Sequence, residues 1–321
     1  MRRTSSLPMV ETVEGPALPV SLRSALVQVV RQCNFRCSHC SQVAPHTSIE
    51  GVDGADLIDL KKRLDELVAR GLSRVRFTGG EPLLHPHLPD LIRYAASSGL
   101  DTSIVTNGVL LPRVADRLID AGLGALWISL YGPTHASYAS VAHRSPPSFT
   151  HSRMIKLFSS RGVRVGLYCA VDLRSPNLGL SLVSQLAEGL SHVKFLQMME
   201  QGRNLDLATA TGELNAAALL EIVRFKSSHP EVEVSVSMRS GQRRDFERLG
   251  FRIPEHVGCT LGMQDSWSID VDGSPEPCCL MMGPKAKPRA EIGLHHGCPA
   301  MPEYGIRERN EFICPLTYAT A

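Results

Sequence analysis

The feature that most constrains the fold is a repeated unit: an apolar strand, a polar or glycine-rich loop, and an amphipathic helix that ends at glycine. Strands and helices that alternate at this spacing are typical of parallel sheets joined by right-handed crossovers. The pattern predicts an α/β fold in which six units form a barrel or a partial (β/α)6 barrel over residues 23–205. We expect its six strands at residues 25–30, 74–77, 102–105, 125–130, 163–171 and 193–198.

The pattern changes outside this region. Residues 1–22 contain several prolines and acidic residues and no apolar run, so we expect a disordered tail. Residues 206–257 are predicted to be a connecting region with one helix and one late strand. Residues 258–321 are rich in cysteine and are predicted to form a small separate domain.

The composition disfavours a nucleic-acid-binding protein, a membrane protein and a disulfide-rich protein. A net charge of +2 and an aromatic content of 5% do not favour nucleic acid or an anionic membrane as a partner. No apolar run is long enough to span a membrane. Nine cysteines without a signal peptide favour a cytoplasmic chain that uses its thiols as metal ligands rather than in disulfides.

Three cysteines lie within eight residues, in the loop after the first expected strand. Cys33, Cys37 and Cys40 have the spacing C-x3-C-x2-C. Three thiolates this close can hold three corners of a four-iron cluster and leave one iron open for another ligand. A structural zinc site is the alternative, with His39, His46 or a distant cysteine as the fourth ligand.

The next two strands also end in loops that suit a binding site. The second strand runs into Gly79, Gly80 and Glu81, and the third is followed by Thr106 and Asn107. Because parallel strands end at one mouth of a barrel, we expect these loops to face the cysteine loop. Glycines without a Cβ let the backbone approach a ligand closely. Asn107 precedes a glycine, and Asn-Gly is a favoured turn pair. The alternative is therefore that Thr106 and Asn107 form the turn and do not contact a ligand.

With the cysteine loop after one strand and the glycine pair after the next, residues 23–205 resemble the radical S-adenosylmethionine (SAM) enzyme superfamily. The resemblance implies a [4Fe-4S] cluster on the three cysteines, whose open iron binds the amino and carboxylate groups of SAM. His39 stands where the family usually has an aromatic residue near the adenine. Ser129 lies near the end of the fourth expected strand, where related enzymes often place a polar residue that contacts the cofactor. The alternative is a buried serine that bonds to the backbone. The implied cofactor-binding residues are His39, Gly79, Gly80, Glu81, Thr106, Asn107 and Ser129.

The C-terminal cysteines form a second group. Cys259 and Cys278, with a glycine between them, resemble the start of the auxiliary-cluster extensions of this superfamily, in which cysteines flank a β-hairpin. Residues 269–273 fit that hairpin turn. Five cysteines match the shorter, single-cluster form (twitch) better than the two-cluster form (SPASM). A structural zinc site is the alternative. The implied ligands of a second, auxiliary [4Fe-4S] cluster are Cys259, Cys278, Cys298 and Cys314, with Cys279 spare.

The resemblance also implies a reaction. A flavodoxin- or ferredoxin-type electron donor reduces the cluster, SAM is cleaved, and a 5′-deoxyadenosyl radical takes a hydrogen atom from the substrate. We expect a sugar, aminocyclitol or nucleoside from specialised metabolite (antibiotic) biosynthesis, because residues 1–22 are too few for a peptide-recognition domain. Peptide modification is the second hypothesis and a non-catalytic metal-binding protein the third. A molybdenum-cofactor-type cyclisation is not expected, because residues 317–321 lack a glycine- and arginine-rich end.

Two thiols are candidates for deciding how the reaction ends. Cys169 lies on the fifth expected strand, and Cys279 is the spare C-terminal cysteine. Cys169 can return a hydrogen atom to the substrate and produce an epimer if it points into the barrel. Cys279 is the other candidate for this role. Transfer of an electron to the auxiliary cluster would instead produce an oxidised product. The alternative for Cys169 is a small buried hydrophobic residue.

Overall fold

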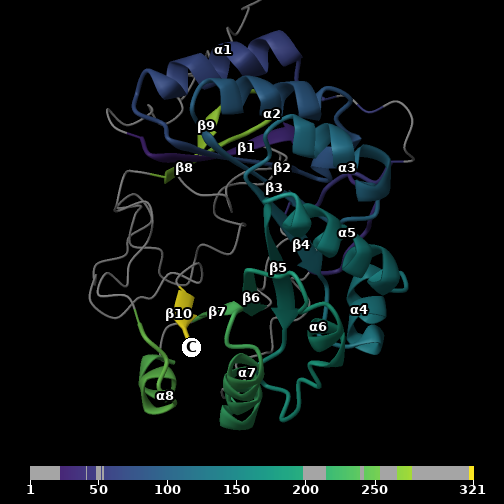
Figure 1. Cartoon of the computed structure of the whole chain (residues 1–321), viewed down its shortest axis with the longest axis vertical. Coiled ribbons are helices and arrows are strands. Elements are labelled where there is room, and N and C mark those ends of the chain that lie inside the picture. Colours follow the sequence, from purple (N-terminus) through teal and green to yellow (C-terminus); the bar gives the residue numbers. More distant parts are fainter. Residues whose placement is uncertain are drawn as a thin grey trace, which may run out of the picture.

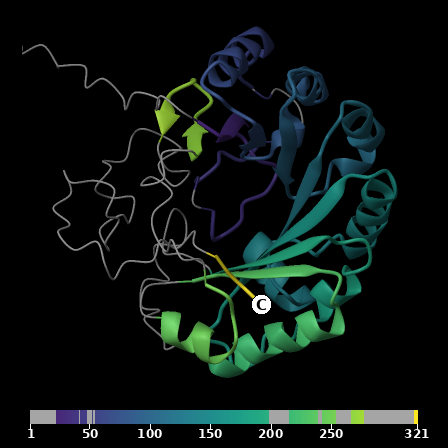
Figure 2. The same cartoon turned by 60° about the vertical axis from the view of Figure 1, so that its left-hand side comes forward.

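The computed structural model describes residues 22–40, 42–47, 52, 54–197, 215–238, 242–253, 266–276 and 318–321. In this part of the chain one sheet has the strand order β10-β7-β6-β5-β4-β3-β2-β1-β8-β9. Figures 1 and 2 show the sheet curling into a partial barrel with helices along its outer face. The strands are β1 (Ser24–Val30), β2 (Arg74–Gly79), β3 (Asp101–Thr106), β4 (Ala125–Leu130), β5 (Arg164–Val171), β6 (His192–Gln197), β7 (Glu233–Ser237), β8 (Ser266–Ile269), β9 (Pro275–Glu276) and β10 (Tyr318–Thr320).

The helices connect the parallel strands. The first α-helix begins at a side-chain cap, because the carboxylate of Asp56 accepts hydrogen bonds from the N–H groups of Ile58 and Asp59. It is followed by Gly71, whose φ of +95° reverses the chain toward β2. The helices are α1 (Leu57–Val68), the short 3-10 helix η1 (Pro82–Leu84), α2 (Leu88–Ser97), α3 (Leu111–Asp120), α4 (His135–Ala142), α5 (Ser148–Ser160), α6 (Ser181–Gln185), α7 (Ala216–Ser228) and α8 (Arg243–Arg248).

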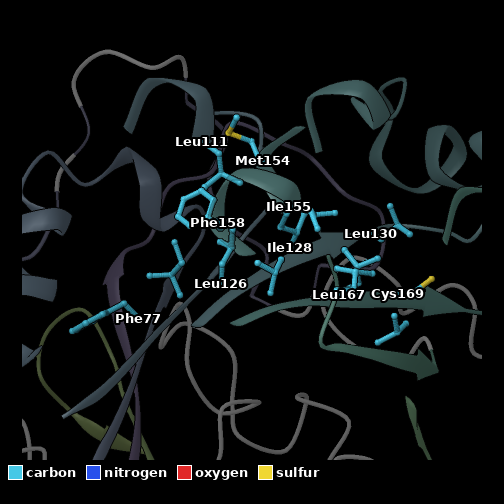
Figure 3. Close-up of a cluster of buried hydrophobic side chains, with 14 of the residues drawn as sticks. Phe77, Leu111, Leu126, Ile128, Leu130, Met154, Ile155, Phe158, Leu167 and Cys169 are labelled. Atoms are coloured by element: carbon cyan, nitrogen blue, oxygen red, sulfur yellow. The ribbon is translucent and has the colours of Figure 1, made fainter. Parts of the chain in front are cut away.

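Side-chain alternation along the strands separates the two faces of the sheet. Ile128 and Leu130 of β4 are buried, and Figure 3 shows them beside Ile155 and Phe158 of α5. Residues at the intervening positions, such as Trp127, therefore face the barrel interior. The layer between sheet and helices forms the hydrophobic core, and the interior face is left for polar side chains.

The α/β fold class and its largely parallel sheet are confirmed. β1 to β7 pair in parallel with their neighbours in sequence, and all six expected strands are present within a few residues of their predicted ends. The structure extends the predicted barrel, because α7 and β7 of the expected connecting region form a seventh parallel unit beside β6. Val234 and Val236 of β7 are fully buried, which explains why this strand belongs to the sheet.

Pieces of the expected C-terminal domain complete the two edges of the same sheet. β8 pairs in parallel with β1, and β9 folds back on β8 through the predicted hairpin turn, in which Gly273 donates to the Asp270 carbonyl. β10 pairs antiparallel with β7 at the opposite edge. Among the described helices, none has the length and apolar character needed to cross a membrane.

Candidate active site

The cysteine loop lies directly after β1, at the end where the parallel strands terminate. Cys33 is held by two backbone hydrogen bonds, donating to the Pro45 carbonyl at 2.9 Å and accepting from the Thr47 N–H at 3.1 Å. The Cys40 N–H donates to the Cys37 carbonyl at 3.3 Å. Cys33 and Cys37 are buried, Cys40 is partly buried, and all three are free thiols. Backbone hydrogen bonds therefore fix the loop that carries the three thiols.

The donor set fits a multi-iron cluster. In the described residues, no group of three or more His, Cys, Asp or Glu side chains lies close enough to hold one metal ion. A cluster distributes its thiolate ligands over several irons, so the thiols need not converge on one point. Burial, the Glu81 carboxylate and the two neighbouring thiols together raise the pKa of the Cys33 thiol to about 12. The protein alone disfavours thiolates here, whereas the positive charge of iron favours them.

The glycine pair after β2 packs against the start of the cysteine loop. The Gly80 N–H donates to the Val30 carbonyl at 2.8 Å, and the Glu81 N–H donates to the Gln32 carbonyl at 2.9 Å. A Cβ added to Gly80 would overlap the Gln32 carbonyl, and one added to Gly79 would overlap the Val30 carbonyl. Glycine is therefore required here for contact between two loops of the protein. The cofactor contact expected from Gly79 and Gly80 stays a prediction.

The carboxylate of Glu81 links the loop after β2 to the loop after β3. It is buried and accepts hydrogen bonds from the Thr106 hydroxyl at 2.6 Å, the Asn107 N–H at 2.8 Å and the Leu83 N–H at 3.1 Å. Burial raises the pKa of Glu81 to about 7, although these hydrogen bonds oppose the shift. The side chain is thus fully occupied in holding two loops together.

Asn107 connects the loop after β3 to the cysteine loop. Its side-chain amide donates to the Asn34 side-chain oxygen at 2.7 Å, and Asn34 directly follows Cys33. Its carbonyl oxygen accepts from Nε2 of His151, a fully buried residue of α5, at 3.1 Å. Thr106 is engaged in the same way, because its hydroxyl donates to Glu81 and accepts from the Gly108 N–H. Thr106 and Asn107 thus form hydrogen bonds both within their own turn and to neighbouring loops, and the cofactor contact expected from them stays a prediction.

The cofactor contacts expected from His39 and Ser129 stay predictions, and the structure shows only the surroundings of these two residues. The His39 ring lies 5.2 Å from the Tyr131 ring, centre to centre, and its Nδ1 atom is buried without a hydrogen-bond partner. Burial lowers the pKa of His39 to about 4, so the imidazole is neutral. Ser129 is partly buried on the interior face of β4, in register with Tyr168 of β5.

A layer of cationic and aromatic side chains crosses the barrel interior. Trp127 and Tyr168 stack with their ring centres 4.7 Å apart. The Arg76 guanidinium and the Lys194 ammonium lie 5.5 Å and 5.2 Å from the Trp127 ring centre. Arg76 also donates to the Tyr168 hydroxyl at 2.6 Å. These four side chains, which we call the interior layer, come from β2, β4, β5 and β6.

The interior layer concentrates positive charge. Burial, and then the nearby Arg76 charge, lower the pKa of Lys194 to about 8, although Glu233 opposes the shift. Gly166 of β5 makes room for the layer, because a Cβ there would press into the Trp127 indole ring. An anionic group in the interior would relieve the repulsion between the two cations.

Cys169 does not face the interior, so the condition for its role as a hydrogen donor to the substrate is not met. It pairs with Leu130 of β4 and Phe195 of β6, which are both buried beneath the helices. It is itself fully buried, burial raises the pKa of its thiol, and Figure 3 places it in the hydrophobic cluster. Its neighbour Tyr168 takes the interior position instead. Cys169 is the buried hydrophobic residue of the alternative interpretation.

The expected auxiliary ligands lie outside the described residues. This holds for Cys259, Cys278, Cys298 and Cys314, and also for the spare Cys279. The hairpin expected between the first two is present as β8 and β9. Its Asp270 carboxylate is buried and accepts a hydrogen bond from Arg31, the residue after β1, at 3.0 Å.

Several residues of this site were not predicted from the sequence. Arg76 and Lys194 alternate with buried apolar residues of their strands, and this alternation was a signal for an interior position. Nothing in the sequence pointed to Asn34 or His151, because their partners lie 73 and 44 residues away.

The comparisons with known proteins agree with this geometry. The model of the family described as the Radical SAM superfamily matches residues 27–172. A GTP 3',8-cyclase of Chlorobaculum tepidum is 31% identical over 248 residues, which cover 72% of this chain and 68% of that protein. A GTP 3',8-cyclase 1 of Mycobacterium tuberculosis is 33% identical over 135 residues, or 40% of this chain and 36% of that protein.

Solved structures share the fold at low sequence identity. Streptococcus suis SuiB bound to S-adenosylmethionine has a TM-score of 0.65 and 14% identity, over 91% of this chain and 70% of that chain. The enzyme anSMEcpe with bound AdoMet has a TM-score of 0.55 and 16% identity, over 81% of this chain and 72% of that chain. At this identity the likeness concerns the fold.

Proposed function

The chain belongs to the radical SAM superfamily, and we propose that it acts on a small polar substrate of the sugar, aminocyclitol or nucleoside class, bound in the barrel interior. The interior layer is the observation that carries this proposal. Aromatic faces suit the rings of sugars and bases. The Arg76 guanidinium and the Lys194 ammonium suit a phosphate or carboxylate. The substrate would bind between this layer and the cysteine loop.

The chain's own residues have distinct tasks in this proposal. When bound on Cys33, Cys37 and Cys40, the cluster and SAM supply a radical that can take a hydrogen atom from an unactivated carbon. Neutral His39 packs beside the cofactor, and the Ser129 hydroxyl is available to its polar groups. Glu81 holds the loops after β2 and β3 in place.

Binding measurements with single variants test the substrate site. Lys194→Met should raise the Kd of a phosphorylated nucleoside at least tenfold and leave that of the unphosphorylated nucleoside unchanged, because only the phosphate meets the ammonium. Lys62→Met, on the outer surface of α1, is the control. If wild type and Lys194→Met bound every anionic ligand with equal Kd values, the interior layer would have no role in substrate binding.

A purine nucleotide is the second candidate substrate. It is favoured by the 31% identity to a GTP 3',8-cyclase over 72% of this chain. Titration with GTP and guanosine separates the two candidates. Tight binding of GTP that is lost in Lys194→Met favours the purine nucleotide, whereas no binding of GTP favours a smaller anionic substrate, such as a sugar phosphate.

We further propose epimerisation or oxidation as the outcome. Cys279 would return a hydrogen atom for epimerisation, and an auxiliary cluster on Cys259, Cys278, Cys298 and Cys314 would accept an electron for oxidation. Turnover in deuterated water distinguishes them, because only a thiol donor places solvent deuterium in the product. Iron analysis of a Cys33→Ala, Cys37→Ala, Cys40→Ala variant tests the second cluster, with about four irons expected if it forms and none if it does not.

A further inference from the structure

The cysteine loop touches the segment that follows α4. The Ser38 N–H donates to the Val141 carbonyl at 3.0 Å. The Arg144 guanidinium lies 5.0 Å from the centre of the Phe35 ring. Two stretches of chain about a hundred residues apart therefore share one face of the molecule, and Cys37 lies within it.

Both stretches are free of acidic side chains. The chain as a whole has 34 Lys and Arg against 32 Asp and Glu, yet residues 15–49 and 121–171 contain no Asp or Glu. These two stretches therefore separate basic from acidic residues along the chain. Such a separation produces a local positive field that attracts an acidic partner.

The cations of this face are accessible. Arg36 and Arg144, which we call the basic face, are exposed. Within the described residues neither Arg36 nor Arg144 forms an ion pair with a carboxylate. Arg36 is the residue before Cys37, so the basic face adjoins a cluster ligand along the chain.

We propose that the basic face is the docking site of an acidic one-electron carrier protein, a flavodoxin or ferredoxin. The inference rests on the radical SAM chemistry of the chain and not on the choice of substrate. One electron leaves the carrier, oxidising its reduced flavin or iron–sulfur centre by one step, and reduces the cluster on Cys33, Cys37 and Cys40. No bond or proton is exchanged. Docking here keeps the electron's path through the protein short, because Arg36 directly precedes Cys37 in the chain, and Phe35, which Arg144 contacts, donates its N–H to the Cys33 sulfur at 3.3 Å.

Charge reversal tests the docking site. In the reconstituted protein, Arg36→Glu with Arg144→Glu should weaken binding of a flavodoxin at least tenfold and slow cluster reduction by the same factor at low salt. Reduction by dithionite, a small reductant that needs no docking, should be unchanged. The matched control is Arg224→Glu with Arg244→Glu, exposed residues of α7 and α8 that change the net charge equally. Arg36→Glu alone should have part of the effect.

The outcomes separate this proposal from the others. Equal flavodoxin affinity in wild type and the Arg36→Glu, Arg144→Glu variant, with dithionite reduction intact in both, would overturn the docking site. An equal loss in the Arg224→Glu, Arg244→Glu control would overturn it too, because net charge rather than this face would then govern binding. Neither result bears on the substrate, which is tested by the Lys194→Met titrations.

Discussion

At the scale of single residues, buried polar side chains set the relation between the strand-end loops. His151 donates to the carbonyl of Asn107, Asn107 donates to Asn34, and Glu81 accepts from the same loop. His151 keeps its proton on Nε2, because its partner is a carbonyl, and its Nδ1 is buried without a partner. The position of the cysteine loop therefore depends on a histidine that belongs to a distant helix.

His151 makes the stability depend on pH. Burial lowers its pKa from 6.5 to about 4, so the unfolded chain binds a proton in this range that the folded chain excludes. The resulting stability is complete above pH 6.5 and is lost as the pH falls toward 4, by at most about 3 kcal/mol. His151→Gln keeps an N–H donor but does not titrate. The free energy of unfolding of wild type minus that of His151→Gln should decrease from pH 7 to pH 4.

The exposed His135, at the start of α4, provides the control. The free energy of unfolding of His135→Gln, measured against wild type, should show little change with pH. The opposite result would be that the free energies of unfolding of wild type and His151→Gln differ by the same amount from pH 7 to pH 4. That result would show that His151 is protonated as easily in the folded state as in the unfolded one.

At the scale of elements, the chain after β2 can pack against the backbone of the cysteine loop only because residue 80 is glycine. Gly80→Ala should cost about 1–3 kcal/mol of stability, because the overlap is with rigid backbone rather than a flexible side chain. It should also reduce the iron taken up on reconstitution. Urea unfolding and iron analysis measure the two effects.

Gly99→Ala is the control for this prediction. Gly99 has a φ of +79°, but no atom lies within 4 Å of the added Cβ. It should therefore cost about 1 kcal/mol from backbone strain alone and leave iron uptake unchanged. Wild-type iron uptake by Gly80→Ala would contradict the packing role given to the glycine pair.

The hairpin of β8 and β9 is attached to the first strand by charge as well as by pairing. Arg31 bonds the buried Asp270 at 3.0 Å, whereas the more exposed Asp272 lies 3.7 Å away. Asp270→Asn should reduce the free energy of urea unfolding by about 1–3 kcal/mol, because a hydrogen bond between charged groups is lost. Asp272→Asn should cost less than about 1 kcal/mol. Equal effects of the two variants would rule out a special role for the buried carboxylate.

At the scale of the whole molecule, a strand close to the C-terminus protects an edge of the sheet. Ala319 of β10 is fully buried, and Thr320 and Arg252 exchange backbone hydrogen bonds. Ala319→Asp should destabilise the fold by more than about 2 kcal/mol, because it buries an unpaired charge. It should also promote association by exposing the edge of β7. Urea unfolding and light scattering test this.

Ala321 is exposed, one residue beyond the strand. Ala321→Asp adds the same charge without burying it, and should change neither stability nor association. If both variants behaved like wild type, β10 would not contribute to closing the sheet.

Features that depend on local spacing are predictable from the order of residues alone. Strand positions, glycine helix ends, the cysteine loop and the hairpin turn at residues 269–273 were all predictable, because each follows from the order of a few neighbouring residues. Alternation also implied that Tyr168 and Cys169 face opposite sides of the sheet. It did not say which side was the interior.

Contacts between strands and loops depend instead on how distant segments pack in three dimensions. Pairing of β5 with β4 and β6 places Cys169 beneath the helices and Tyr168 in the interior. The interior layer combines Arg76 and Lys194, which are 118 residues apart in the chain. Glu81 and Gly80 acquire their roles from Thr106 and Gln32 on other loops. Such contacts depend on register and close approach, and neither is recorded in the order of nearby residues.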